Sequence, residues 1–244
     1  MHLVFCRWIV CACAAITCST LAVSVASGLE LRDVRPGYYR AVTRIPDLSS
    51  GPWRKLVYSV CVPWARRAHA DFIRECEASF KTFGKPASPY EHQIQGKVIY
   101  RSPRLVSILF DMLQYTGGAH PNAFYRTFNL GMVNGKPALM RLADFFVPGS
   151  DFRQQISDAI INKLMLNEAA VDVVNGKVTR LTEEQLERFV VGPEGLRFFF
   201  NHYELGPYAA GRFNVRLTVQ ELGTDFKRAL LPEGRAAPGA SVRK

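Results

Sequence analysis

The stretch LVSILFDMLQYTGGAHPNAFYRTFNL, residues 105–130, decides the fold. In its first part, Leu105–Tyr115, every second residue from Val106 to Met112 is apolar (Val106, Ile108, Phe110 and Met112), which predicts a strand with one apolar face. A second strand is predicted over Ala123–Leu130. The loop between them contains Gly117-Gly118, which can adopt backbone angles that other residues resist, and Pro121, which stiffens the exit. The segment therefore predicts two sheet strands joined by a shaped loop.

The pattern of apolar and turn-forming residues along the rest of the chain predicts an alternation of strands and helices. Further strands are predicted at Tyr38–Ile45, Leu56–Val62, His92–Tyr100, Ala138–Met140, Leu196–Phe200 and Phe213–Val219, with a hairpin that pairs Val171–Val174 with Lys177–Arg180. Helices are predicted at Trp64–Phe83, Phe152–Asn167, Glu183–Phe189 and Val219–Leu230. Asn134-Gly135 and Asn175-Gly176 indicate tight turns, and Thr182 begins a capping box. Antiparallel hairpins mixed with separate helices predict an α+β fold of mixed antiparallel sheets with packed helices.

The first 27 residues have the pattern of an export signal. Arg7 is the only charged residue before Glu30, an apolar run covers Trp8–Val23, and small residues follow it up to Ser27. We expect cleavage after Ala26 or Ser27, with an uncleaved anchor as the alternative. The predicted location is therefore the periplasm or the exterior, with no stable membrane span after cleavage.

The chain of 244 residues is 48% hydrophobic and 21% charged, an ordinary globular composition. Its net charge is +10, and +9 remains once the segment that holds Arg7 is removed. In the cytoplasm such a charge would suggest nucleic acid, but outside it the polyanions are cell-wall polymers and anionic lipids. We therefore expect no nucleic-acid partner. The alternative is that the charge only serves solubility.

Of six cysteines, only Cys61 and Cys76 lie beyond the first 18 residues. In an oxidising compartment, a strand and a helix that packs back on it could join them in a disulfide. The alternative is two buried free thiols. There is no Cys-x-x-Cys motif, which argues against a redox enzyme.

Two loops are candidate binding sites. The first runs over Tyr115-Thr116-Gly117-Gly118-Ala119-His120-Pro121-Asn122, and the second runs over residues 201–211 with Tyr203, Pro207 and Tyr208. Rigid rings beside glycine and proline suit stacking on a sugar or filling a cleft. Both loops could instead be tight structural turns. The candidate binding residues are Tyr115, Thr116, Gly117, Gly118, His120, Asn122, Tyr203, Pro207 and Tyr208.

Motifs for catalysis are absent from the sequence. It contains no Gly-x-Ser-x-Gly, no phosphate-binding loop and no His-Glu-x-x-His. A metal-dependent or hydrolase-like enzyme that uses His120 and His202, with Asp111 or Glu204 as a third ligand, remains the alternative. No metal or cofactor is otherwise expected.

Four stretches of the sequence, including parts of both candidate loops, resemble the RsiV-like extracellular domain. The pieces that carry the resemblance are the loop from Tyr115 to Asn122, residues 142–146, residues 181–189, and the stretch from Phe198 to Gly211. That domain occurs in the ectodomains of RsiV-type anti-sigma factors and beside the catalytic domain of some peptidoglycan deacetylases, and a secreted mycobacterial immunogenic antigen is a more distant relative. The resemblance spans roughly residues 38–230.

The resemblance implies an α+β ectodomain without catalysis of its own, and anti-sigma ectodomains of this type bind lysozyme. Because a sigma-binding segment and a deacetylase domain are not recognised in the sequence, we expect the chain to inherit neither signalling nor deacetylation from these relatives. The sequence and this resemblance together predict four parts. These are a signal peptide over 1–27, an N-terminal α+β portion over 28–114, an RsiV-like portion over 115–230 and a disordered basic tail over 231–244. The expected function is an exported, non-catalytic envelope protein that recognises lysozyme or a peptidoglycan-type glycan through the two loops. The oligomeric state stays open.

Overall fold

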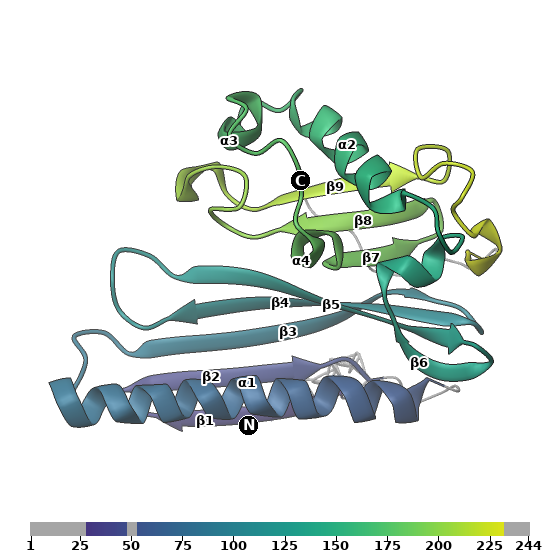
Figure 1. Cartoon of the computed structure of the whole chain (residues 1–244). Helices are drawn as coiled ribbons and strands as arrows, with labels where there is room; N and C mark the ends of the chain where they lie inside the picture. The colour runs from purple at the N-terminus through teal and green to yellow at the C-terminus, as the bar shows by residue number, and fades with distance from the viewer. Residues whose placement is uncertain (1–27, 48–52, 232–244) are drawn as a thin grey trace, which may run out of the picture.

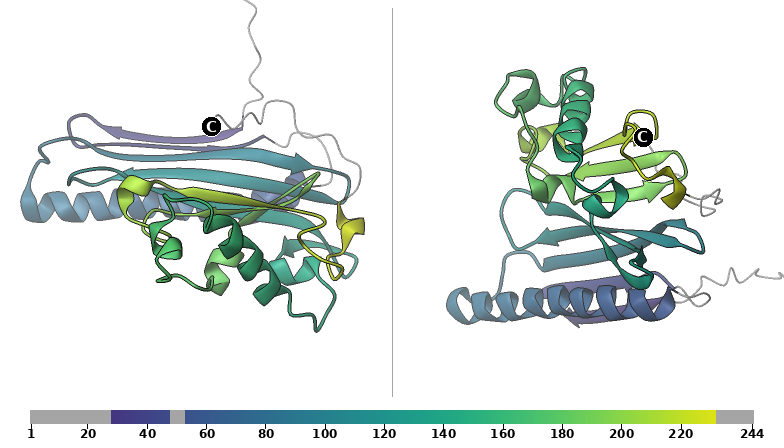
Figure 2. Two further views of the ribbon diagram at one scale, coloured as in Figure 1. Left: turned by 90° about the horizontal axis from the view of Figure 1, so that it is seen from above. Right: turned by 45° about the vertical axis from the view of Figure 1, so that its right-hand side comes forward.

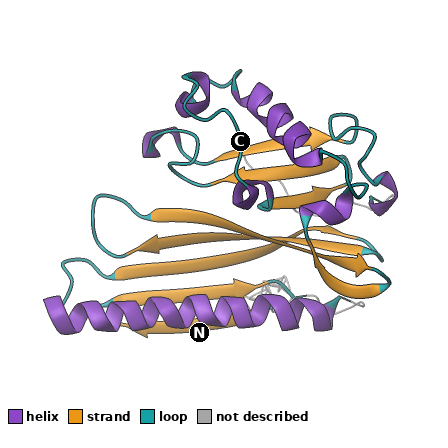
Figure 3. Ribbon diagram, in the orientation of Figure 1, coloured by secondary structure: helices purple, strands orange, loops and turns teal. Residues whose placement is uncertain are grey.

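The computed structural model describes residues 28–47 and 53–231. The predicted signal peptide, the turn at residues 49–52 and nearly all of the predicted tail lie outside the described residues. The architecture has four layers: a long helix, a six-stranded sheet, a three-stranded sheet and a shorter helix (Figure 1). The helices lie mainly outside the two sheets, and four strands, β3 to β6, follow one another along the chain (Figure 3). The predicted α+β class is confirmed.

The first sheet contains strands β1 to β6 in sequence order. Neighbours are antiparallel except β2 and β3, which run parallel because helix α1 connects them. The elements are β1 (Leu29–Arg35), β2 (Tyr39–Ile45), α1 (Arg54–Phe83), β3 (Tyr90–Arg101), β4 (Leu105–Tyr115), β5 (Asn122–Val133) and β6 (Lys136–Met140). Helix α1 runs along one face of this sheet (Figure 1), where Trp64 packs against Phe110 and Phe128 at ring-centroid distances of 4.8 and 5.3 Å.

The predicted strand at Leu56–Val62 is wrong, because these residues form the first turns of α1. The buried positions of α1 are Val57, Cys61, Ala65, His69, Phe72, Cys76 and Phe80. Steps of three and four residues mark one face of a helix, and this spacing continues from the predicted helix back through the apolar run. Pro63 lies inside the helix without ending it. A short apolar run fits a strand and a buried helix equally well, which explains the error.

The predicted Cys61–Cys76 disulfide is also wrong. Both cysteines are free and buried on α1. Fifteen residues of helix separate them by about 22 Å along the axis, whereas a disulfide needs α-carbons within about 7 Å. Burial raises the pKa of both thiols to about 12, so both stay protonated and act as apolar core groups.

The second sheet contains β7 (Phe189–Gly192), β8 (Gly195–Phe200) and β9 (Phe213–Thr218), all antiparallel. Helix α2 (Phe152–Leu164) covers its outer face with the predicted stripe of Phe152, Ile156, Ile160 and Leu164. The short elements are η1 (Leu142–Phe145), α3 (Val171–Val174), α4 (Glu183–Leu186), η2 (Tyr208–Ala210) and η3 (Arg228–Leu230). The capping box at Thr182 is confirmed, since its side chain accepts a hydrogen bond from the Gln185 backbone. Viewed from above, the strands of the two sheets run in similar directions (Figure 2).

Buried polar side chains attach the two sheets to each other. The Asn129 side chain on β5 donates to the backbone oxygen of Phe189 at 2.9 Å, and the backbone of Val191 donates to the Ser107 hydroxyl at 2.9 Å. Ser107 in turn donates to Asn129, so each polar group is satisfied. These bonds fix β7, an edge strand of the second sheet, in its position on the first sheet. The predicted portions on either side of residue 115 share that six-stranded sheet, because β5 pairs with β4.

Two predicted elements near the C-terminus are wrong. Instead of a hairpin at residues 171–180, α3 forms a helical turn that ends at Asn175-Gly176, where Gly176 has a φ of 71°. Instead of a helix over residues 219–230, the chain turns at Gly223, with a φ of 80°, and Phe226 bridges back to Phe146. Local helical bonding thus replaces the predicted hairpin in the first place, and a contact between distant segments replaces the predicted helix in the second. Within the described residues, no helix has the length and apolar character needed to cross a membrane.

Asp144 stabilises the turn that leads from the first sheet to α2. Its carboxylate accepts a backbone hydrogen bond from Arg141 at 2.7 Å. We expect Asp144→Ala to lower the free energy of unfolding by about 1 kcal/mol in urea unfolding, with ligand binding unchanged. Asp144→Asn keeps a hydrogen-bond acceptor and should lose less stability than Asp144→Ala. A loss of binding without a loss of stability would contradict this structural role.

Candidate functional site

The two loops singled out from the sequence meet in the structure. The first joins β4 to β5 and the second joins β8 to β9, and both lie at the same end of the molecule (Figure 1). The Tyr208 hydroxyl of the second loop donates a hydrogen bond to the backbone oxygen of Pro121 in the first, at 2.8 Å. Because 87 residues separate these partners, the contact depends on the packing of one sheet on the other.

The centre of the contact is a stack of three aromatic rings. The imidazole of His120 lies 3.5 Å from the Tyr208 ring at an interplanar angle of 16°, and that of His202 lies 4.2 Å away at 20°. Two rings cannot share one face of a tyrosine at such distances, so Tyr208 lies between the two histidines. The Tyr203 hydroxyl lies 3.4 Å from Nε2 of His120. We call His120, His202, Tyr203 and Tyr208 the ring cluster.

Tyr203 is the exposed member of the ring cluster. Its side chain is 59% exposed, whereas Tyr208 is only partly exposed. Tyr203 also has a φ of 67°, a left-handed conformation that costs a residue with a side chain about 1 kcal/mol or more. The chain therefore holds an aromatic ring toward solvent at a cost in backbone energy, a combination found at binding sites.

The other predicted site residues have simpler placements. Gly117 and Gly118 have φ values of 90° and 100°, so the first loop requires glycine at both positions. Tyr115 donates its hydroxyl to the backbone of Gly118 at 3.3 Å and so braces its own loop. Thr116, Asn122 and Pro207 are exposed at the edges of the two loops.

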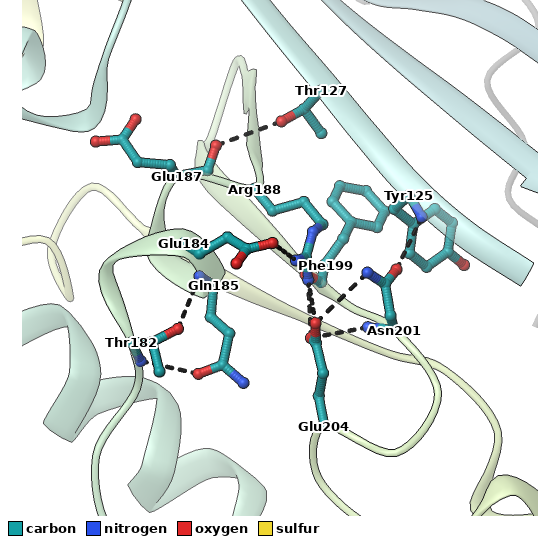
Figure 4. Close-up of polar contacts among 10 residues, drawn as sticks. All are labelled: Tyr125, Thr127, Thr182, Glu184, Gln185, Glu187, Arg188, Phe199, Asn201 and Glu204. Carbon is teal, nitrogen blue, oxygen red and sulfur yellow. Dashed lines mark hydrogen bonds and ion pairs between the residues drawn. The ribbon is translucent and has the colours of Figure 1, made fainter. Parts of the chain in front are cut away.

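A charged network that the sequence analysis missed holds the second loop in place (Figure 4). Arg188 is buried, and its guanidinium donates to both carboxylate oxygens of Glu204 at 2.8 Å. Glu204 also accepts a hydrogen bond from the backbone of Asn201 at 2.9 Å, and the Asn201 side chain accepts one from the backbone of Tyr125 on β5 at 2.8 Å. The network thus fixes residues 201–204, and with them Tyr203, against both sheets. In the sequence, Arg188 resembles an ordinary exposed residue of a charged helix.

Arg212 adds a positive charge beside the ring cluster. Its guanidinium pairs with Asp111 at 2.7 Å and lies 4.0 Å above the ring of Tyr125. The pKa of His202 is lowered, first by burial and then by the charge of Arg212, and its Nδ1 is buried without a hydrogen-bond partner. His202 is therefore neutral near pH 7, which suits its place against Tyr208.

This geometry does not favour a metal site that uses both His120 and His202. Their rings lie on opposite faces of Tyr208, whereas two nitrogens that bind one zinc ion must each approach it to about 2.1 Å. Across residues 28–47 and 53–231, no group of three histidine, cysteine or carboxylate side chains is placed to hold a metal ion.

Comparison with known families divides the chain into two segments. Residues 59–123 match the family described as deacetylase PdaC, and residues 143–220 match the protein family of unknown function DUF3298. We call residues 59–123 the PdaC segment and residues 143–220 the DUF3298 segment. The predicted resemblance to RsiV-like ectodomains is confirmed at this level.

Two similar proteins support this assignment. The peptidoglycan-N-acetylmuramic acid deacetylase PdaC of Bacillus subtilis (strain 168) is 24% identical over 147 residues, which cover 59% of this chain and 31% of that protein. The chain thus spans about a third of the length of this curated relative. A DUF3298 family crystal structure from Pseudomonas aeruginosa PAO1 matches with a TM-score of 0.60 at 20% identity, and covers 85% of this chain and 96% of that one. The structural match confirms the fold.

The ring cluster lies between the two segments. His120 belongs to the PdaC segment, whereas His202, Tyr203 and Tyr208 belong to the DUF3298 segment. The site therefore exists only when both segments are folded and in contact.

Proposed function

We propose that this protein is an exported, non-catalytic binding protein of the cell envelope that recognises a cell-wall glycan through the ring cluster. The observation that carries the proposal is the exposed ring of Tyr203, held in a left-handed conformation beside the Tyr208 stack. Sugars present apolar C–H faces that stack on aromatic rings, while their hydroxyls bond to polar groups nearby. Because the rings are already ordered, little conformational entropy is lost on binding.

The envelope location is supported by three observations. The first 27 residues have the order of charge, apolar run and small residues that is typical of an export signal. The relative from Bacillus subtilis is named for its action on peptidoglycan, a polymer of the envelope. The net charge of +10 also fits a surface that operates beside anionic wall polymers.

Lysozyme is the second candidate partner, because the RsiV-like resemblance implies it. Animal lysozymes of the common type are cationic, so the positive charge of this chain would oppose their approach at long range. Contact would then depend on short-range apolar packing on Tyr203 and Tyr208. A metal-dependent or hydrolase-like enzyme that uses His120 and His202 is the third candidate, and bound metal or a loss of turnover in His120→Ala would favour it.

We expect Tyr203→Ala to weaken binding of soluble peptidoglycan fragments by about 2 kcal/mol, roughly thirtyfold, in calorimetric titration. Alanine keeps the Cβ atom, so the backbone cost at this position is retained and the loss reports the ring. Tyr208→Ala should weaken binding similarly, because it removes the ring that both histidines contact. The matched control is Phe83→Ala, which removes an exposed ring from the last residue of α1, an element that contributes no residue to the ring cluster.

The dependence on salt separates the partners. Affinity for an anionic wall polymer should fall steeply as salt rises, because screening weakens the attraction of the basic surface. Affinity for lysozyme should hold or increase over the same range, because screening removes a repulsion. Unchanged affinity for both partners in Tyr203→Ala and Tyr208→Ala, in proteins that melt normally, would contradict the proposed site.

A further inference from the structure

A cavity lies between the two sheets, where the PdaC and DUF3298 segments face each other. Its volume is about 180 Å³. Its walls come from both sheets, with Ile99 and Leu109 on one side and Val190 and Phe199 on the other. Cavities at the boundary between two folded units are common sites for small ligands.

The cavity is apolar inside and positively charged at its rim. Leu109, Val190 and Phe199 form a small buried cluster of their own. At the rim, Arg197 of β8 lies directly opposite Arg216 of β9 in the strand register. Glu194 pairs with Arg216, and no carboxylate of the described chain forms an ion pair with Arg197. The rim therefore carries one positive charge in excess.

The two opposed arginines at the rim are unfavourable for the protein when no ligand is bound. Like charges directly opposite each other on neighbouring strands destabilise a sheet. Arg197 also lines a cavity whose inner walls are apolar, and the carboxylate in the lining, that of Glu194, already pairs with Arg216. Local conflicts of this kind are expected where a ligand supplies the missing group.

We propose that this cavity binds a small apolar carboxylate, whose carboxylate pairs with Arg197 and whose body fills the space between Leu109, Val190 and Phe199. A guanidinium binds a carboxylate through two parallel hydrogen bonds, which suits a ligand with its charge at one end. A cavity of about 150 Å³ holds a benzene molecule, so one aromatic ring or a short branched chain matches the size of this cavity. Both segments contribute to the site, so occupancy stabilises their contact.

The test uses phenylacetate as the probe, with phenylacetamide as a neutral ligand of the same shape and acetate as a charged ligand without the ring. Titration of the purified protein is followed by NMR at the methyl groups of Ile99 and Leu109. We expect saturable shifts with phenylacetate at a dissociation constant of about 1 mM or lower. Phenylacetamide should bind about tenfold more weakly or worse, and acetate should leave these methyl groups unchanged.

Arg197→Met keeps the aliphatic stem and removes the charge. This substitution should weaken the affinity for phenylacetate by about tenfold or more and leave the affinity for phenylacetamide unchanged. Arg180→Met, at an exposed arginine away from the cavity, is the matched control and should bind like the original protein. Phenylacetate should also raise the melting temperature of the control but not that of Arg197→Met at the same concentration. Equal binding of acid and amide, an unchanged affinity in Arg197→Met, or shifts that avoid Ile99 and Leu109 would overturn the proposal.

Discussion

Glu204→Leu is expected to lower the free energy of unfolding by about 3 kcal/mol. The substitution leaves the guanidinium of Arg188 buried without its main carboxylate, and an arginine cannot lose its charge to relieve this. Glu184, an exposed residue 3.4 Å away, compensates only in part. The backbone of Asn201 also loses its acceptor. The measurement is urea unfolding at neutral pH.

A double-mutant cycle separates the charge from the packing. Arg188→Met combined with Glu204→Leu replaces the ion pair with apolar side chains and should recover much of the stability, as replaced buried ion pairs do elsewhere. The matched control is the exposed pair of Arg153 and Glu183, at 3.0 Å, where Glu183→Ala should cost less than about 1 kcal/mol. Additive effects in the cycle, or a loss below 1 kcal/mol in Glu204→Leu, would show that the network does not hold the second loop.

His92 is expected to make the fold sensitive to acid. Its ring is buried and stacks on Phe72 at 4.8 Å, and neither of its nitrogens has a hydrogen-bond partner among the described residues. Burial, and then the charge of His69, lowers the pKa of His92 to about 4. Because an unfolded histidine titrates near 6.5, the unfolded state binds more protons between these values. Stability should therefore fall as the pH drops from about 6.5 to about 4, by about 3 kcal/mol in total.

His92→Phe tests this expectation. The new ring keeps the stack on Phe72 and removes two unpaired nitrogens, so the variant should be at least as stable as the original at pH 7 and more stable at pH 5. The quantity to measure is the difference in unfolding free energy between the two proteins at several pH values. Phe72→Leu alters the same cluster without a titrating group, so its deficit should stay constant with pH. A difference between His92→Phe and the original that does not change with pH would contradict this role.

The strands that carry the strongest alternation were predictable from the sequence. The predicted strand Leu105–Tyr115 has the bounds of β4, because its side chains alternate between two different surroundings. The edge strand β1 was missed because most of its residues are exposed, so it has no apolar face to detect. The strand at Leu56–Val62 was mispredicted because a run of seven apolar or small residues does not distinguish a strand from a buried helix turn.

The candidate site was predictable only in part. Its loops were visible because glycine pairs, prolines and tyrosines are locally unusual, as in Gly117-Gly118 and Tyr208. That His120 would stack on Tyr208 depends on how two sheets pack, which no local pattern encodes. Arg188 and Glu204 carry no local signal, because a charged residue buried by tertiary contacts looks like any surface charge in the sequence.

Hydrogen exchange in the presence of soluble peptidoglycan fragments tests the central claim most directly. If the ring cluster is the binding site, the fragments should slow exchange at the backbone amides of residues 115–122 and 201–211 together. These loops lie far apart in the sequence and meet through the contact between Tyr208 and Pro121. The protection should disappear in Tyr203→Ala and persist in Phe83→Ala. Protection at other residues with none in these two loops, or no protection at saturating fragment, would contradict the proposed function.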